Sequence, residues 1–135
     1  MKPLIVVTSK PVSITRVIKS VSSPRSGGTV LFLGTVRASS RGMKVTKMRL
    51  ESAKDLAKAD LRRICKAVDQ KYAVNHIAVE HRVGSLSVGE IIVAIAVGAA
   101  HREDAFKACK YIIDELKKTT PIWKKEIGPA RERWV

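Results

Sequence analysis

The chain has 135 residues, of which 45% are hydrophobic and 28% charged, a composition typical of one globular domain and unlike that of a disordered chain. The 26 lysines and arginines outnumber the 12 acidic residues and give a net charge of +14. This excess predicts an anionic partner: a nucleic acid, a phosphorylated small molecule or an acidic protein. The apolar runs are too short for a signal peptide or a membrane span, so we expect a cytoplasmic protein.

Residues that would indicate a metal or redox centre are scarce. Cys65 and Cys109 each fall on an apolar helical position outside any CxxC pair, which favours core packing over a disulfide or a metal site. The three histidines form no HxxxH or HExxH pattern, so we expect neither a metal nor another cofactor. Asn75 and Gln70 are the only side-chain amides, and with the many lysines they suggest a thermophilic source.

The N-terminal part of the chain predicts three strands and one short helix. Apolar residues at Ile14, Val17, Ile18 and Val21 recur with the period of an amphipathic helix. Gly34 lies inside a strand-like run, where it predicts a bulge or a close backbone approach. The polar segment 38–44 is expected to be a mobile loop. The strands are expected at 4–7, 29–37 and 45–51.

The rest of the chain predicts two longer helices and two strands. Apolar periodicity predicts helices at 55–72 and from Glu103 to about Lys118, with Pro121 ending the second. Alternating residues from Ile77 to Val83 predict a half-buried strand, and the run 91–99 predicts a buried one. The segment 84–90 is interpreted as a turn. The order βαββαββα with an irregular tail indicates one α+β domain, residues 1–135, with a mostly antiparallel sheet.

Four lysines lie in "LKKTTPIWKKE", residues 116–126. On a helical projection Lys117 borders the apolar face of the last helix, whereas Lys118 points away. Packing beside that face would partly desolvate Lys117 and lower its pKa, but a lysine that only covers the core edge is the commoner case.

Thr120 precedes a proline and must be extended, and Trp123 is expected to anchor the segment against the domain. Only one of Lys124 and Lys125 can then face the same site as Lys117, because successive residues of an extended segment face opposite ways.

Other polar residues are ambiguous when taken singly. Arg37 ends a strand, and His101 and Arg102 precede the last helix, whose free N–H groups could hold a phosphate. Taken alone, each is better explained as a surface charge. His81 lies on the apolar side of its strand and is interpreted as a structural histidine. The sequence has no Ser/His/Asp arrangement, Walker loop or GxGxxG motif.

Seven stretches, taken together, resemble the large, catalytic subunits of molybdopterin synthase. They are "FLGTVR" (32–37), "LE" (50–51), "HRVGSLSVGE" (81–90), "AHREDAF" (100–106), "IIDELK" (112–117), "PIWKKE" (121–126) and "RW" (133–134). The resemblance implies an α/β-hammerhead fold and a homodimer within a heterotetramer. Each large subunit would bind a small ubiquitin-like subunit whose Gly-Gly C-terminus carries a thiocarboxylate. Two sulfur transfers would convert cyclic pyranopterin monophosphate into the dithiolene of molybdopterin.

The resemblance also assigns roles to individual residues. It implies that Lys117 is the principal catalytic lysine, in proton transfer or stabilisation of the acyl intermediate, and that Lys124 is the second. The positions of Arg37, His101 and Arg102 correspond to residues that hold the pterin phosphate, some of them across the dimer, and Phe32 corresponds to an aromatic lining the pocket. The chain departs from the family at Ser52-Ala53, where relatives commonly have an aromatic residue, so the packing there is an open question.

Two other classes of function fit parts of the sequence. The charge of +14 also suits a nucleic-acid-binding domain, although aromatic residues make up only 4% of the chain and no RNP, KH or helix-turn-helix signature is present. A scaffold that docks a ubiquitin-like protein without catalysis is the second alternative. Salt-dependent nucleic-acid binding would favour the first, and absence of dithiolene formation the second.

Overall fold

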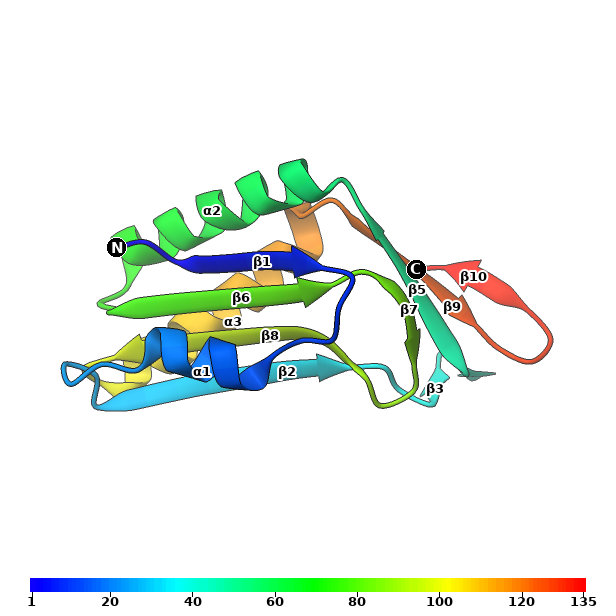
Figure 1. The fold of residues 1–135 in the computed structure, drawn as a ribbon, viewed down its shortest axis with the longest axis horizontal. Helices are drawn as coiled ribbons and strands as arrows, with labels where there is room; N and C mark the ends of the chain where they lie inside the picture. Colours follow the sequence, from blue (N-terminus) through cyan, green and yellow to red (C-terminus); the bar gives the residue numbers. More distant parts are fainter.

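The computed structural model describes residues 1–135 and contains three helices and ten strands (Figure 1). The helices are α1 (Ile14–Val21), α2 (Lys54–Lys71) and α3 (Arg102–Thr119). The strands are β1 (Leu4–Thr8), β2 (Gly28–Thr35), β3 (Ser39–Ser40), β4 (Met43–Lys44), β5 (Lys47–Ser52), β6 (His76–Arg82), β7 (Gly84–Ser87), β8 (Ile91–Ala99), β9 (Ile122–Ile127) and β10 (Glu132–Trp134). The mixture of helices with mostly antiparallel strands confirms the predicted α+β class.

The main sheet has the strand order β1-β6-β8-β2. Only β1 and β6 are parallel, and the other neighbours are antiparallel. Helices α2 and α3 cover one face of this sheet and α1 covers the other, so the sheet is the middle layer, with β6 and β8 as its central strands (Figure 1). Strand β8 is buried along almost its whole length, because it has a strand on each side and a helix on each face.

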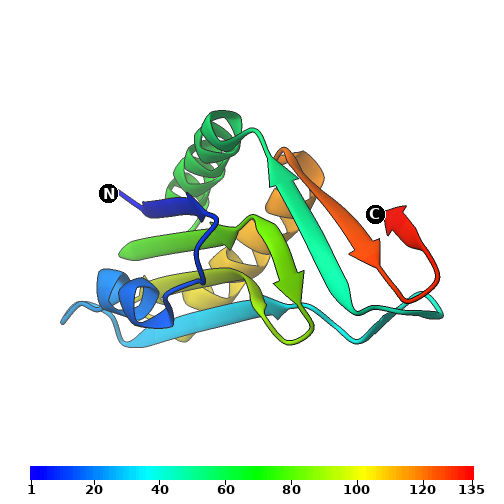
Figure 2. The ribbon, with the colours of Figure 1, turned by 45° about the vertical axis from the view of Figure 1, so that its right-hand side comes forward.

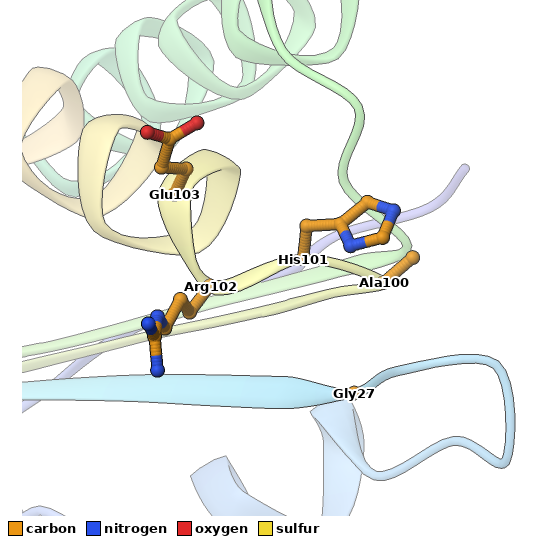
Figure 3. A pocket seen from close by; sticks show the side chains of 5 residues that line it. All are labelled: Gly27, Ala100, His101, Arg102 and Glu103. Carbon is orange, nitrogen blue, oxygen red and sulfur yellow. The ribbon is translucent and has the colours of Figure 1, made fainter.

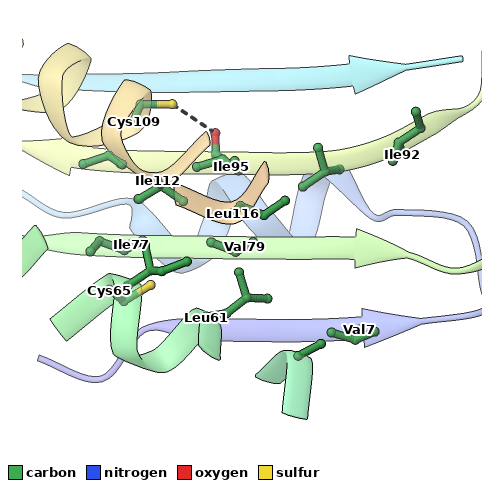
Figure 4. Close-up of a cluster of buried hydrophobic side chains, with 14 of the residues drawn as sticks. Val7, Leu61, Cys65, Ile77, Val79, Ile92, Ile95, Cys109, Ile112 and Leu116 are labelled. Atoms are coloured by element: carbon green, nitrogen blue, oxygen red, sulfur yellow. Dashed lines mark hydrogen bonds between the residues drawn. The ribbon is translucent and has the colours of Figure 1, made fainter. Parts of the chain in front are cut away.

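The larger apolar core lies between the main sheet and the helices α2 and α3 (Figure 4). Helical periodicity puts Leu61, Ile64 and Cys65 of α2 and Ile112 and Leu116 of α3 on the faces that turn toward the strands. These side chains are 7% exposed or less. Removal of this apolar surface from water is the main force that fixes both helices on the sheet.

The opposite face of the main sheet carries small residues where α1 crosses it. Val17 and Val21 of α1 pack on Ala78, Ala94 and Ala96 and form a second, smaller cluster. Alanines leave room for the helix backbone to approach the strands closely. Ser13 caps the helix by accepting a hydrogen bond from the Arg16 N–H at 3.2 Å.

A buried carboxylate fastens α1 to the sheet, and it explains why β6 is not the half-buried strand that the sequence predicts. Glu80 is 0% exposed. Its two oxygens accept hydrogen bonds from the Ser13 N–H at 2.7 Å and from Arg16 Nε and Nη2 at 2.9 and 2.7 Å. A glutamate in an alternating strand normally marks a solvent face, but here α1 covers that face and neutralises the charge.

A second sheet, the side sheet, stands at one end of the main sheet and has the order β10-β9-β5-β7 (Figure 2). Two sequence interpretations were wrong here. The segment 84–90 is not simply a turn, because β7 pairs with β5 before the chain turns into β8. The tail is not irregular, because β9 pairs antiparallel with β5 over six residues and β10 then pairs with β9.

The connection after β2 has more order than a mobile loop. Strand β2 has a register irregularity at Gly34–Thr35, which confirms the expected bulge. The polar segment that follows forms the β3–β4 hairpin, whose turn residues Arg41 and Gly42 have φ values of 49° and 76°. Positive φ at both central positions is the geometry of a tight hairpin turn with the native strand twist.

The two cysteines fill the core, as the sequence predicts. Both are free and buried, and burial raises the pKa of the Cys65 thiol to about 12 and that of the Cys109 thiol to about 11. They are therefore protonated and unreactive at neutral pH. None of the three helices is long and apolar enough to cross a membrane.

The ion pair at Glu80 gives a testable prediction for stability. Glu80→Gln removes the charge but keeps the shape, and we expect it to lower the free energy of unfolding by about 2 kcal/mol, the scale of hydrogen bonds to charged groups. Urea denaturation measures this loss. The control Asp69→Asn changes an exposed carboxylate of α2 and should shift stability by no more than about 0.5 kcal/mol. Equal effects of the two substitutions would contradict the assigned role of Glu80.

Candidate active site

A cavity of ≈ 780 Å³ lies where the end of α3, the end of β2 and the side sheet meet. Half of its lining is polar, and most of the charged groups in it are cationic. The charged and imidazole side chains of the lining are Arg37, Arg41, His81, Lys117, Lys124 and Glu126. Its apolar lining includes Phe32, Ile92, Ile95, Ile113, Leu116 and Ile122. A concave site with apolar walls and convergent cations is suited to an anionic ligand with a hydrophobic body.

Lys117 reaches the cavity from the last turn of α3. Ile113 lies one turn earlier and Leu116 is adjacent, and both line the same cavity. The helical projection therefore predicted correctly that Lys117 borders the packed face. Of the two alternatives for Lys117, the commoner one holds, because its side chain is exposed to solvent at the edge of the core.

Lys124 enters the same cavity from β9. It pairs with Leu50 of β5, and the alternation of the strand turns Ile122, Lys124 and Glu126 inward. Burial and the nearby charge of Lys117 lower the pKa of the Lys124 ammonium, while Glu126 partly opposes the shift. Lys124 is thus the desolvated lysine of the pair.

The other two lysines of the cluster point away, as predicted. Lys118 is exposed and lies 3.5 Å from the Glu115 carboxylate. Lys125 lies on the outer side of β9, 2.9 Å from Glu132 and 5.4 Å from the centroid of the Trp134 ring. Neither contributes to the cavity.

Trp123 does not anchor the segment, which corrects the sequence interpretation. Its side chain is 53% exposed on the outer side of β9, because it alternates with the inward-facing Ile122 and Lys124. Backbone pairing with β5 holds Lys124 instead. A large ring suggested burial, but strand register decides which side it occupies.

An unforeseen carboxylate fixes the corner between α3 and β9. Asp60 of α2 accepts hydrogen bonds from the Thr119 and Thr120 hydroxyls at 2.8 and 2.7 Å and from Arg63 at 2.9 Å. Partial burial works against the charged form, but these hydrogen bonds outweigh it and lower the pKa of the Asp60 carboxyl. These contacts therefore fix the chain between α3, which carries Lys117, and β9, which carries Lys124. No motif in the sequence indicated this contact across 60 residues.

Glu126 supplies the buried negative charge of the cavity. It is 5% exposed and accepts a hydrogen bond from Arg133 Nε at 3.1 Å, while Arg133 Nη2 donates to the Ser40 carbonyl at 2.5 Å. Although burial opposes ionisation, the Ser40 hydroxyl and the Arg133 guanidinium lower the pKa of the Glu126 carboxyl. This chain of contacts ties β9, β10 and the β3–β4 hairpin together over the cavity. The "PIWKKE" and "RW" stretches contain both residues, but their pairing could not be read from the sequence.

The structure brings Phe32 and Arg37 into the cavity, as the sequence suggested. The bulge at the end of β2 lies beside these two residues. A side chain at Gly34 would meet Val93 Cγ1 at 3.0 Å and the Phe32 ring at 3.5 Å. Glycine therefore avoids a tight contact with Val93, whereas the distance to the Phe32 ring is an ordinary packing distance. Ser52 and Ala53, where the chain departs from the family pattern, do not line the cavity.

His101 and Arg102 lie elsewhere, in a separate open pocket of ≈ 490 Å³ at the N-terminus of α3 (Figure 3). Gly27, Ala100 and Glu103 complete its lining, and Arg102 extends toward β2 whereas Glu103 points to the other side. This pocket is at the Gly28 end of β2, and the larger cavity begins at Phe32, about 13 Å away along an extended strand. One chain therefore does not bring all six predicted residues together.

Comparison with known proteins gives a consistent family. The family model described as "MoaE protein" matches residues 7–119, so the segment with Lys124 lies after the matched residues. The molybdopterin synthase catalytic subunit of Homo sapiens is 41% identical over 133 residues, covering 98% of this chain and 71% of that protein. The rat protein of the same name is 43% identical over 126 residues, and this chain spans 63% of its length.

Solved structures agree with the fold. The crystal structure of molybdopterin synthase from Staphylococcus aureus superposes with a TM-score of 0.90 and 31% identity, covering 100% of this chain and 98% of that one. A complex of subunits 1 and 2 of molybdopterin-converting factor from Helicobacter pylori contains a chain that superposes with a TM-score of 0.74. At 16% identity, with 98% and 88% of the two chains covered, this second likeness concerns the fold alone.

The electrostatic coupling of Lys117 and Lys124 can be measured directly. In NMR titrations of labelled lysine side chains, Lys124 should deprotonate below the ordinary value of 10.5. Lys117→Ala removes a neighbouring positive charge, so the pKa of Lys124 should rise toward that value. Lys118→Ala is the matched control, because Lys118 faces solvent outside the cavity. A Lys124 titration that does not respond to Lys117→Ala would show that the two ammonium groups are not neighbours in solution.

Proposed function

This chain belongs to the MoaE family, and we propose that it is the catalytic subunit of a molybdopterin synthase, an enzyme that transfers sulfur in molybdenum cofactor biosynthesis. The sulfur donor in this proposal is the C-terminal thiocarboxylate of a small ubiquitin-like subunit ending in Gly-Gly. The acceptor is cyclic pyranopterin monophosphate, and the product is the dithiolene of molybdopterin. The observation that carries the proposal is the convergence of Lys117 and Lys124, from two different elements, on one cavity.

The charges of the cavity suit the charges of the reactants. The thiocarboxylate and the cyclic phosphate are both anionic, and Arg37, Lys117 and Lys124 offer them positive charges in the cavity lining. The apolar wall formed by Phe32 and its neighbours suits the flat pterin ring. Because Glu126 is already paired with Arg133, it leaves these cations free to bind substrate.

Each sulfur transfer needs charge stabilisation at one carbonyl carbon. A carbon–sulfur bond forms between the thiocarboxylate sulfur and a side-chain carbon of the pterin while a carbon–oxygen bond at that carbon breaks, the oxygen leaving with the opened phosphate or as water. This substitution links the two molecules as a thioester. Water then attacks the thioester carbonyl, a carbon–oxygen bond forms, and the carbon–sulfur bond to the carbonyl breaks. The sulfur stays on the pterin, the small subunit leaves with a carboxylate, and a second thiocarboxylate repeats the sequence.

The two lysines have different roles in the transfer because their surroundings differ. Negative charge develops on the carbonyl oxygen as water adds, and a positioned ammonium lowers the free energy of that state. We assign this stabilisation, and the associated proton transfer, to Lys117 at the open side of the cavity. Lys124, half-buried and with a lowered pKa, contacts the thiocarboxylate end or the substrate.

A homodimer would complete the site with His101 and Arg102. Strand β2 is an edge of the main sheet, and Thr29, Leu33 and Thr35 along it are exposed. A long open edge of this kind invites pairing with another strand. Twofold antiparallel pairing of two β2 edges would set the Gly28 end of one chain against the Thr35 end of the other.

That arrangement would bring the second pocket to the cavity of the partner. A side chain at Gly28 would meet the Arg102 Cα at 3.6 Å, so Arg102 lies beside the first residue of β2. Arg37 lies just beyond Thr35, the last residue of β2. The free N–H groups at the N-terminus of α3 and the side chains of His101 and Arg102 would then hold the phosphate from across the interface. Two such large subunits with two small ones make the heterotetramer.

Lys117→Ala is expected to abolish molybdopterin formation while leaving the binding of the small subunit and of the precursor within a few-fold of wild type. The reason is that Lys117 stabilises charge that is present only during the transfer. Single-turnover product detection and calorimetric binding measure the two effects. Lys118→Ala, one residue away on the exposed side, should behave as wild type. Near-normal product formation by Lys117→Ala would refute the role.

The shared site can be tested by mixing two inactive variants. Lys117→Ala damages the cavity, and Arg102→Ala damages the pocket that serves the partner. Co-refolded or exchanged mixtures should regain about a quarter of wild-type activity, because half of the dimers are mixed and each mixed dimer has one intact site. If all the residues act within one chain, the mixture will stay as inactive as its components.

A further inference from the structure

His81 is a buried titratable group whose surroundings exceed the needs of a core residue. It is 1% exposed, and its strand neighbours are Val7 of β1 and Val93 of β8. An apolar side chain would fill this position more cheaply in free energy, since a buried imidazole must have its polar atoms satisfied. Yet His81 also forms part of the cavity wall. The question is which of its atoms the cavity meets.

The hydrogen bond at Nδ1 shows which nitrogen of the His81 ring is left to face the cavity. His81 Nδ1 lies 2.8 Å from the carbonyl oxygen of Arg82. Because a carbonyl oxygen only accepts hydrogen bonds, Nδ1 must carry the proton, and a neutral ring then has its lone pair on Nε2. Burial, together with the charge of Lys124, lowers the pKa of the imidazole to about 4 against the opposing hydrogen bond. The ring is therefore neutral near neutral pH.

Nε2 opens onto the cavity. It has no hydrogen-bond partner within the chain. Only two side-chain nitrogen or oxygen atoms are both shielded from solvent and without a hydrogen-bond partner, and these are Ser52 Oγ and Arg82 Nε. An unpartnered Nε2 outside that group must therefore reach accessible space. Since the residue as a whole is buried, the space it reaches is the cavity that it lines.

The charged groups around Nε2 identify its partner. Arg37, Arg41 and Lys117 also line the cavity, but the charge that acts on the imidazole is that of Lys124. The one carboxylate of the cavity, Glu126, is engaged by Arg133. An ammonium group beside a neutral nitrogen with a free lone pair is a donor beside an acceptor.

We propose that His81 is a positioning residue of the sulfur-transfer site: its Nε2, which has no partner in the structure, accepts a hydrogen bond from the Lys124 ammonium in the site loaded with the sulfur donor, and so holds that group toward the reacting carbonyl. This inference rests on the proposed function. A neutral acceptor suits the task better than a carboxylate would. A carboxylate would pair with Lys124 and cancel the positive potential that the thiocarboxylate and the phosphate need, whereas an imidazole directs the ammonium and leaves its charge intact.

Two variants separate this role from a purely structural one. In His81→Gln the amide can occupy the place of Nε2, and in His81→Asn the amide can occupy only the place of Nδ1 beside the Arg82 carbonyl. We expect kcat to fall by about tenfold to a hundredfold in the asparagine variant, the scale of a lost hydrogen bond to a charged group, and by less in the glutamine variant. Affinity for the small subunit should stay unchanged in both. If the asparagine variant is the more active one, or if both match wild type, the proposal is wrong.

The wild-type protein provides a test that depends neither on variants nor on turnover. Nitrogen NMR of the three imidazole rings distinguishes the two neutral tautomers, and His81 should show a protonated Nδ1 and an unprotonated Nε2 at neutral pH. Protonation on Nε2, or a charged ring, would overturn the proposal. Because this readout needs no substrate, it still decides the state of His81 if the wild type forms no molybdopterin, a result that would reject the proposed function instead.

Discussion

The antiparallel pairing of β5 with β9 is the constraint on which the site depends. Helix α3 delivers Lys117 to the rim of the cavity, but a free tail after Pro121 would leave Lys124 in solvent. The ladder instead places Lys124 opposite Leu50 and turns it inward with Glu126. Asp60 holds the corner between the two elements through Thr119 and Thr120. The geometry of the two cations is set by backbone register and not by a large anchoring side chain.

This arrangement of the two lysines is electrostatically unfavourable, and it prepares the cavity to bind an anion. Lys124 loses water while it faces the like charge of Lys117, so its ammonium is less stable than in solution. Glu126 relieves part of this unfavourable energy, but Arg133 already engages its carboxylate. An anion that enters the cavity therefore meets uncompensated positive charge, carried by elements whose backbones are already in place. The same logic explains why a neutral imidazole is a better neighbour for Lys124 than another carboxylate.

Local pattern predicted the parts of the fold that depend on local physics. The three helices follow from apolar periodicity, and β8 from a continuous apolar run. The bulge at Gly34 was also foreseen. The pattern failed where a partner distant in sequence decides: β9 is rich in charge and was taken for an irregular tail, Glu80 seemed solvent-facing until α1 covered it, and Trp123 seemed an anchor. Among the site residues, Phe32, Arg37, Lys117 and Lys124 converge within one chain. The sequence left open which lysine is desolvated, and it is Lys124, because burial depends on the facing sheet and not on the helix alone.

Reconstitution tests the central claim most directly: this chain, a small subunit with a thiocarboxylated Gly-Gly terminus, and cyclic pyranopterin monophosphate are mixed, and molybdopterin and the mass of the small subunit are followed together. The account predicts that each molybdopterin formed consumes two thiocarboxylates and returns two carboxylates, and that omitting this chain stops both changes. Loss of thiocarboxylate without molybdopterin, or product formation at the same rate without this chain, would contradict it.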